Sequence, residues 1–153
     1  MTYAVVKMRS IAKTKPDVRR TLELLNLDRT NHCVFVEDNV HYNGMLQKVK
    51  DYVAWGDVDS ETLSVLLEKR GMLEGRKRLT SAYVKDRTAF DDIDSLAKAV
   101  ADGKATLRDV PELKPVLRLH PPRKGHKGLK KPFPEGVIGF HGRDINELLF
   151  TMR

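Results

Sequence analysis

The stretch from residue 19 to residue 55 constrains the fold most, because the spacing of its apolar residues changes twice. Residues 19–27 carry leucines at helical spacing. Residues 32–37 are rich in β-branched and aromatic side chains and lie between turn-forming pairs, which is typical of a strand. Residues 42–53 predict an amphipathic helix, whose apolar face is formed by Tyr42, Met45, Leu46, Val49 and Val53.

The flanking residues complete a β-α-β-α-β unit. Residues 3–9 alternate with apolar side chains on both sides, which predicts a strand buried on both faces. A helix over residues 16–26 has proline in its first turn and a possible capping box before it, Thr14 with Asp17. Residues 53–58 predict a third strand. Each helix is apolar on one face only, so both are expected to cover one face of a three-stranded sheet and to leave the other face for something else.

The rest of the chain predicts a helical and irregular extension, so the fold class is α+β. Asp38 or Asn39, Asp59 or Ser60, and Thr80 are suited to cap helices, and Gly71 and Gly103 to end them. The further helices are expected over residues 60–70, 81–87, 91–102 and 144–152, and a further strand over residues 116–120. We divide the chain into a core (1–59), a helical extension (60–114) and a part with a strand, a basic loop and a last helix (115–153).

Positive charge is concentrated near the C-terminus. The chain has a formal net charge of +7. Residues 61–114 carry eleven Lys or Arg and ten Asp or Glu, whereas residues 115–153 carry eight and three. Residues 118–131 hold six basic residues and no acidic one. The glycine-interrupted part of this run, residues 123–131, lacks a core-forming pattern. It is either a solvated loop or an element that binds a polyanion and becomes ordered on it.

Catalytic and metal-binding patterns are absent from the sequence. The five histidines form no HxxxH or HExxH pair, and Cys33 has no second cysteine with which to form a disulfide or a zinc site. No phosphate-binding glycine loop and no GxSxG elbow occur, which also disfavours an acylphosphatase. We therefore predict no catalytic residue, no metal and no cofactor, with Cys33 as an inert core thiol. No apolar run is long enough for a membrane span, and a reduced, cytoplasmic protein is expected.

Donor side chains at the ends of the core elements favour contact with nucleic acid, because Arg, Asn and Thr suit phosphate and 2′-hydroxyl groups. Thr30 and Asn31 could instead form only a turn. Gly44 could admit a nucleotide or allow tight packing, and Trp55 could stack on a base or fill the sheet edge. The candidate RNA-binding residues are Arg19, Arg20, Arg29, Thr30, Asn31, His32, Tyr42, Asn43, Gly44, Lys48, Arg118, His120, Arg123, Lys124, His126, Lys127, Lys130 and Lys131.

The core resembles the signature of the L-thirty family of large-subunit ribosomal proteins. The residues that carry this resemblance are Leu22, Leu25, Leu27, Arg29, His32, Val34, Met45, Leu46, Val49, Tyr52 and Val53. The resemblance implies a ferredoxin-like core with an antiparallel three-stranded sheet. It also implies a structural, non-catalytic role in the ribosome, with 23S and 5S ribosomal RNA and neighbouring large-subunit proteins as partners.

The extension resembles the long archaeal form of the same family, whose eukaryotic counterpart is L-seven. The matching segments are residues 68–71, 77–80, 117–119, 121–123 with Gly125, 134–136 and 145–149 with Met152. Residues 135–139 depart from the glycine-rich turn that relatives often carry there. The alternative that we keep open is a ferredoxin-like small-molecule regulatory module, which would bind its ligand at a dimer interface and would not need the basic run.

Overall fold

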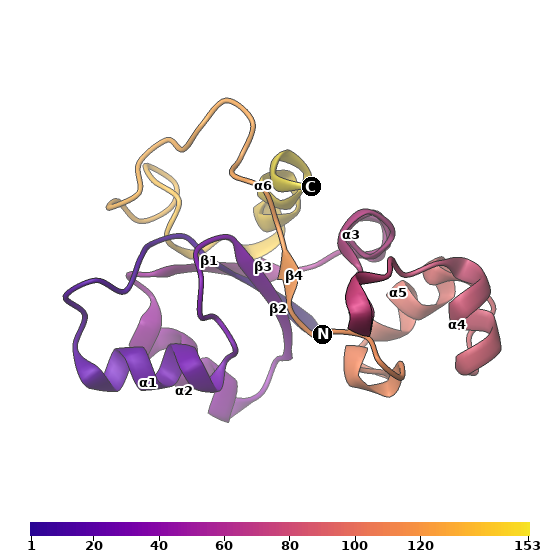
Figure 1. Cartoon of the computed structure of the whole chain (residues 1–153). Helices are drawn as coiled ribbons and strands as arrows, with labels where there is room; N and C mark the ends of the chain where they lie inside the picture. Colours follow the sequence, from indigo (N-terminus) through magenta and orange to yellow (C-terminus); the bar gives the residue numbers. More distant parts are fainter.

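The computed structural model describes all 153 residues, as an α+β structure built on one five-stranded sheet (Figure 1). The strands are β1 (Thr2–Lys7), β2 (His32–Glu37), β3 (Val53–Asp57), β4 (Leu117–Arg118) and β5 (Gly139–Phe140). The α-helices are α1 (Pro16–Leu24), α2 (Val40–Val49), α3 (Ser60–Arg70), α4 (Ser81–Arg87), α5 (Ile93–Ala101) and α6 (Ile145–Met152). Three short 3-10 helices are η1 (Glu74–Arg76), η2 (Leu107–Asp109) and η3 (Gly142–Asp144). No helix combines the length and the apolar character that a membrane span requires.

The sheet has the strand order β4-β2-β1-β3-β5, so the predicted three-stranded sheet is wrong in its extent. Its centre is as expected, because β1 lies between β2 and β3 and is antiparallel to both. The extension adds β4 antiparallel to β2 and β5 parallel to β3, which makes the sheet mixed. Strand β4 lies within the strand predicted over residues 116–120, but it is only two residues long. Strand β5 is also two residues long, and no strand was predicted there because so short a segment shows no alternating pattern.

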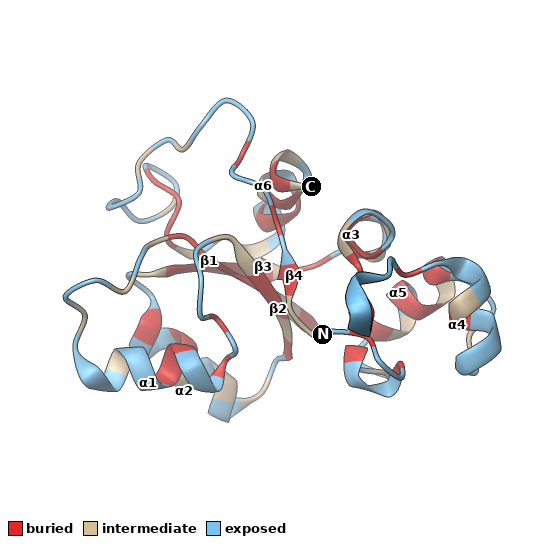
Figure 2. Ribbon diagram, viewed as in Figure 1, coloured by how far each residue is buried: buried red, intermediate tan, exposed pale blue.

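Helices α1 and α2 cover one face of the sheet, as predicted (Figures 1 and 2). Both helices turn buried residues toward the sheet and exposed residues away from it (Figure 2). The ten buried residues of this core are Val5, Leu22, Leu25, Leu27, Val34, Val36, Leu46, Val49, Val53 and Trp55. Trp55 is therefore a core residue rather than a base-stacking one. It does not fill the edge of the sheet, however, because β5 extends the sheet beyond β3.

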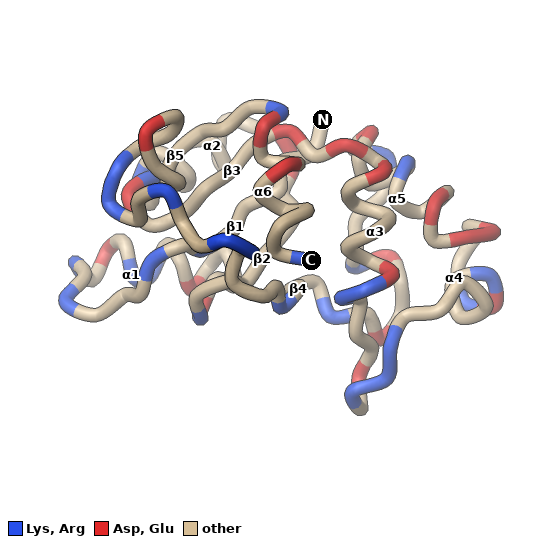
Figure 3. Tube along the Cα trace, turned by 90° about the horizontal axis from the view of Figure 1, so that it is seen from above, with Lys and Arg blue, Asp and Glu red and all other residues tan.

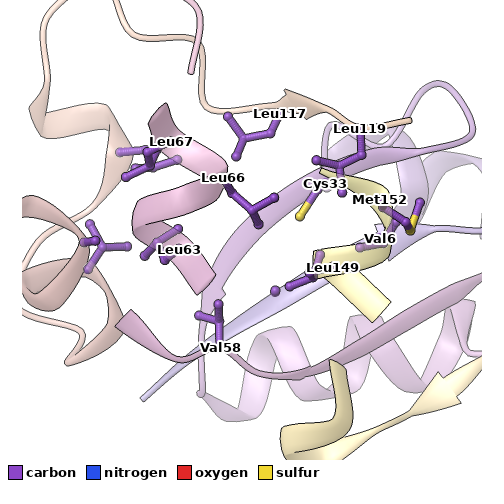
Figure 4. Packing of buried hydrophobic residues seen from close by; sticks show 14 of the residues in the cluster. Val6, Cys33, Val58, Leu63, Leu66, Leu67, Leu117, Leu119, Leu149 and Met152 are labelled. Carbon is purple, nitrogen blue, oxygen red and sulfur yellow. The ribbon is translucent and has the colours of Figure 1, made fainter. Parts of the chain in front are cut away.

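The opposite face of the sheet is covered by the extension, because the β-α-β-α-β unit has no helix on that side. Leu149 and Met152 of α6, Leu117 and Leu119 lie over Val6 and Cys33, and the leucines of α3 continue this core away from the sheet (Figure 4). Helices α4 and α5 pack beyond α3, and the cluster contains 26 buried residues. The division at residues 59/60 and 114/115 stays a prediction.

Local signals placed most helix ends correctly. The Asn39 side chain accepts a hydrogen bond from the Tyr42 amide at 2.9 Å, and Thr80 caps α4 in the same way at 3.3 Å. The predicted capping box of α1 is wrong: Lys15 is the N-cap residue, and the Thr14 hydroxyl lies one position too early and has no partner. Helix α2 ends at Val49 rather than Val53, because a turn at Tyr52 returns the chain to the sheet.

Two buried polar side chains, Asn146 in α6 and His141 before it, stabilise the C-terminal part of the chain. Asn146 accepts a hydrogen bond from the Asp59 amide and donates to the carbonyls of Asp57 and Arg143, all within 2.8–2.9 Å. His141 donates from Nε2 to the Val137 carbonyl at 2.9 Å, and its ring lies 4.3 Å from that of Phe133. The bonds of Asn146 fix the end of β3 to α6, whereas the His141 side chain stabilises the C-terminal part of the chain itself.

Leu46→Asp should prevent folding of the α1–α2 face. Leu46 has no exposed surface, and an unpaired carboxylate there would cost several kcal/mol. Circular dichroism and thermal unfolding measure the effect. Gln47→Asp is the matched control, because the next residue of the same helix is exposed and should tolerate the charge. A folded Leu46→Asp variant would show that α2 is wrongly placed.

The protein should lose stability as the pH falls from about 7.5 to about 5.5. Burial lowers the pKa of His141, against smaller opposing effects of the Val137 carbonyl and Asp144, and burial also lowers the pKa of His126 and His32. Below about pH 6.5, the ordinary histidine pKa, the unfolded chain binds more protons than the folded one, so acid favours unfolding.

Melting temperatures across this pH range would measure the loss. His141→Gln can keep a donor toward Val137 but does not titrate, so its melting temperature should fall less with acid. An identical pH dependence in the variant and the parent would contradict the role assigned to His141.

Candidate nucleic-acid interface

The first group of candidate residues lies at the β2–β4 edge of the sheet. The antiparallel pair places His32 opposite Arg118, and the Leu119 amide donates to the Asn31 carbonyl at 3.0 Å. Arg29, Thr30 and Arg118 are exposed, whereas Asn31 and His32 are half-buried. Residues that are far apart in the sequence thus form one cationic cluster. The sequence predicted these residues individually, but it did not predict that they lie together.

The loop that carries Arg29 and Thr30 is held from below by a buried cation. Lys7 of the central strand donates from Nζ to the carbonyls of Leu27 at 2.9 Å and Asp28 at 2.7 Å. The Lys7 carbonyl accepts from the amide of Asn31, which has a left-handed φ of 67°. Thr30 and Asn31 do form a turn. Lys7 was not identified from the sequence as a residue that positions this loop. The signal was a lysine within a strand predicted to be buried on both faces.

The environment of His32 indicates a positive local potential. Burial lowers its pKa most, and Arg118, Arg29 and Lys7 lower it further against the opposing effect of Asp28. The ring is therefore neutral near pH 7 and can offer hydrogen bonds rather than charge. His32 Nδ1 and Asn31 Oδ1 have no hydrogen-bond partner within the protein. Both atoms are also closed off from solvent, so neither is accessible to a ligand in this conformation.

The second group is the basic loop, residues 123–131. All five of its cationic side chains, Arg123, Lys124, Lys127, Lys130 and Lys131, are exposed. Only Lys131 has a carboxylate partner, Glu135 at 3.9 Å. His126 is half-buried, burial lowers its pKa, and its Nδ1 has no partner.

The basic loop is irregular but attached at both ends. The amides of His120 and Arg123 donate to the carbonyls of Met152 and Thr151 at the end of α6, at 2.9 and 3.1 Å. At the other end the Val137 amide donates to the Gly128 carbonyl at 3.1 Å. Exposed His120 lies where the loop leaves the β2–β4 edge. The unpaired cations of the loop are thus carried by a backbone that is hydrogen-bonded at both ends of the loop.

The third group lies on α1 and the outer face of α2. Arg20, Asn43 and Lys48 are exposed, Tyr42 is half-buried, and Arg19 forms an exposed pair with Glu23 at 3.4 Å. The Asn43 side chain donates to Asp38 Oδ1 at 2.9 Å. Gly44 is exposed, and a β-carbon there would meet no atom within 4 Å. Tight packing therefore does not explain why residue 44 is glycine, and the surface of α2 around Gly44 is open.

The three groups do not form one surface. Helices α1 and α2 lie on the opposite side of the sheet from the basic loop, and the β2–β4 edge lies between them (Figure 1). Within the protein the positive charge is little neutralised, because 28 Lys and Arg take part in only three ion pairs, all between side chains more than half exposed. Lys and Arg lie along the edge near α1 and β4 and on the basic loop, whereas Asp and Glu gather near the N-terminus (Figure 3).

The remaining reactive group, Cys33, is fully buried, and burial raises the pKa of its thiol, so it is the inert core residue that the sequence predicted. No group of three His, Cys, Asp or Glu side chains is arranged to hold a metal ion.

Comparison with known proteins gives a consistent result over the whole chain. Residues 3–53 match the family model described as "Ribosomal protein L30p/L7e". "Large ribosomal subunit protein uL30" of Archaeoglobus fulgidus is 50% identical over 151 residues, and the proteins of the same name from Methanoculleus marisnigri and Methanothrix thermoacetophila are 50% and 51% identical over 152 residues. Each alignment covers 99% of both chains, so the similarity includes the extension.

Gly44→Ala should stabilise the free protein by about 0.5–1 kcal/mol, because alanine favours helix and the added methyl group meets nothing. Thermal or urea unfolding measures the change. Gly56→Ala is the opposite case, since its β-carbon would collide with the Gly142 carbonyl, and it should be destabilising. A loss of stability in Gly44→Ala would show that the outer face of α2 is more crowded than described.

Proposed function

The chain belongs to the L30p/L7e family of ribosomal proteins, and we propose that it is a non-catalytic, structural component of the large ribosomal subunit that binds 23S and 5S ribosomal RNA. Neighbouring large-subunit proteins are its other partners in this proposal. We infer that the β1-α1-β2-α2-β3 unit is its ferredoxin-like RNA-binding core.

The observation that carries the proposal is the set of unpaired cations held over fixed backbone. Residues 123–130 contain four exposed Lys or Arg side chains with no carboxylate partner, on a loop attached to α6. Such side chains can replace the counterions of RNA phosphates, and the release of those ions drives binding. A surface that serves only solubility usually mixes basic and acidic residues, whereas this run contains no acidic residue.

The β2–β4 edge adds a different type of contact. Arg29 and Arg118 are exposed and can bind phosphate with paired donors, while Thr30 offers an exposed hydroxyl group to sugar or base. Lys7 acts as a positioning residue, since it fixes the backbone below Arg29. Because the three groups of candidate residues face different directions, we infer that RNA contacts the protein from more than one side.

Replacing Lys124, Lys127 and Lys130 by glutamine should leave the fold intact and weaken binding to ribosomal RNA. Three lost phosphate contacts should reduce the slope of log affinity against log salt by about 2–3. Filter binding to 23S and 5S RNA at several salt concentrations measures this, with circular dichroism to confirm folding. The matched control replaces three exposed cations of α4 and α5 by glutamine, namely Lys85, Arg87 and Lys98. Its slope of log affinity against log salt should equal that of the parent.

Sedimentation tests the assignment to the large subunit directly. The protein should pellet with large subunits at moderate salt, and the loop variant should be released at lower salt than the control. A parent protein that stays in the supernatant would refute the proposed function, and an unfolded loop variant would show that the loop is needed for folding.

A further inference from the structure

The chain reverses direction directly after α3 in a second basic element, which we name the 71–79 hairpin. Met72 and Arg78 form an antiparallel bridge, the Leu73 amide donates to the Lys77 carbonyl at 2.7 Å, and the Leu79 amide donates to the Gly71 carbonyl at 3.0 Å. At the tip, Gly75 and Arg76 both have left-handed backbone, with φ of 72° and 63°. Two such residues in succession produce a tight reversal.

The hairpin is fixed at its base. Leu73 pairs with Leu113 in a second bridge, and both leucines are buried. The Glu74 amide donates to the Glu112 carbonyl and the Lys114 amide to the Met72 carbonyl, both at 2.9 Å. The first strand of the hairpin is therefore held by backbone bonds to residues 112–114, and the second strand by its bonds to the first.

Positive charge predominates at the tip, where Glu74 is the one acidic residue and forms no ion pair. Arg76, Lys77 and Arg78 are consecutive, exposed and without a carboxylate partner. Arg76 occupies a backbone conformation in which glycine or asparagine would be less strained, so an arginine there points to a function for its side chain. The near balance of charge over residues 61–114 hides this feature, because the acidic residues of the segment lie mostly elsewhere (Figure 3).

The position of the hairpin favours RNA as its ligand. Lys114, which bonds to its base, leads within three residues to β4 and Arg118, so the hairpin lies at the end of the cationic β2–β4 edge. The exposed tip residues are charged or glycine, whereas a protein interface needs apolar or aromatic anchors at its centre.

We propose that the 71–79 hairpin is a second RNA-binding element, in which Arg76, Lys77 and Arg78 contact phosphates of the ribosomal RNA. This inference rests on the proposed function and extends it to a segment that the sequence did not mark as RNA-binding. The hairpin supplies a rigid contact, separate from the basic loop, at the junction of the sheet and the helical part.

The salt dependence of binding tests the contact. Arg76→Gln, Lys77→Gln and Arg78→Gln together should reduce the slope of log affinity against log salt by about 2–3, as for the basic loop. The Lys85, Arg87 and Lys98 variant is again the control, because it removes the same charge. An unchanged slope in the folded hairpin variant would overturn the proposal, while a reduced slope in the basic-loop variant would still support RNA binding. An equal reduction in the control would also overturn the proposal, because the effect would then follow the loss of charge and not its position.

A tethered probe provides an independent readout. Because Cys33 is fully buried, an introduced cysteine is the only reactive thiol of the folded protein and can carry an iron chelate that cleaves nearby RNA. Lys77→Cys and Lys127→Cys should both cleave ribosomal RNA in the complex, whereas Asp91→Cys, exposed just before α5, should not. Cleavage from Lys127→Cys without cleavage from Lys77→Cys would refute the hairpin alone, and cleavage from neither would refute the proposed function as well.

Discussion

The central strand β1 carries apolar side chains on both faces, and each face needs its own cover. Val5 belongs to the core under α1 and α2, whereas Ala4 and Val6 belong to the core on the other side. The first core contains ten buried residues and the second contains 26. The extension is thus not an attachment to a finished domain. It supplies the larger hydrophobic core, and a unit that ended after β3 would leave half of its sheet in water.

This requirement also determines where the cations lie. The sheet order places β4 at one edge and β5 at the other, so the chain between them must cross the face that α6 covers. The basic loop is part of this crossing. Its backbone is tied to α6, and its cationic side chains cannot enter the apolar core without a large desolvation penalty, so they remain on the outer side. Covering the second face therefore also presents an unpaired basic surface.

The predictable parts of the fold were those with a local cause. The Asn39 and Thr80 caps, the end of α3 before Gly71 and the exposure of the basic loop follow from residue types a few positions apart. The pairing of β2 with β4 depends on two residues at each end of a long connection, and β5 has no pattern of its own. The role of Lys7 was missed because it depends on the carbonyls of a loop that lies next to a buried strand. The basic residues of the 71–79 hairpin are consecutive in the sequence, but their fixed hairpin backbone and their position beside residues 112–114 depend on contacts between distant segments.

The distribution of charge matters more for RNA than its sum. At physiological ionic strength electrostatic effects between exposed groups decay over about 8 Å, so an RNA strand near one edge responds to the side chains at that edge. Acidic residues near the N-terminus and the start of α5 therefore do not cancel the cations of the β2–β4 edge or of the hairpin (Figure 3). They lower the net charge without weakening the basic surfaces, and they disfavour binding through the wrong side. Under the proposed function, charge segregation of this kind favours orientations in which the basic surfaces, on their several sides, face RNA and the acidic region faces away from it.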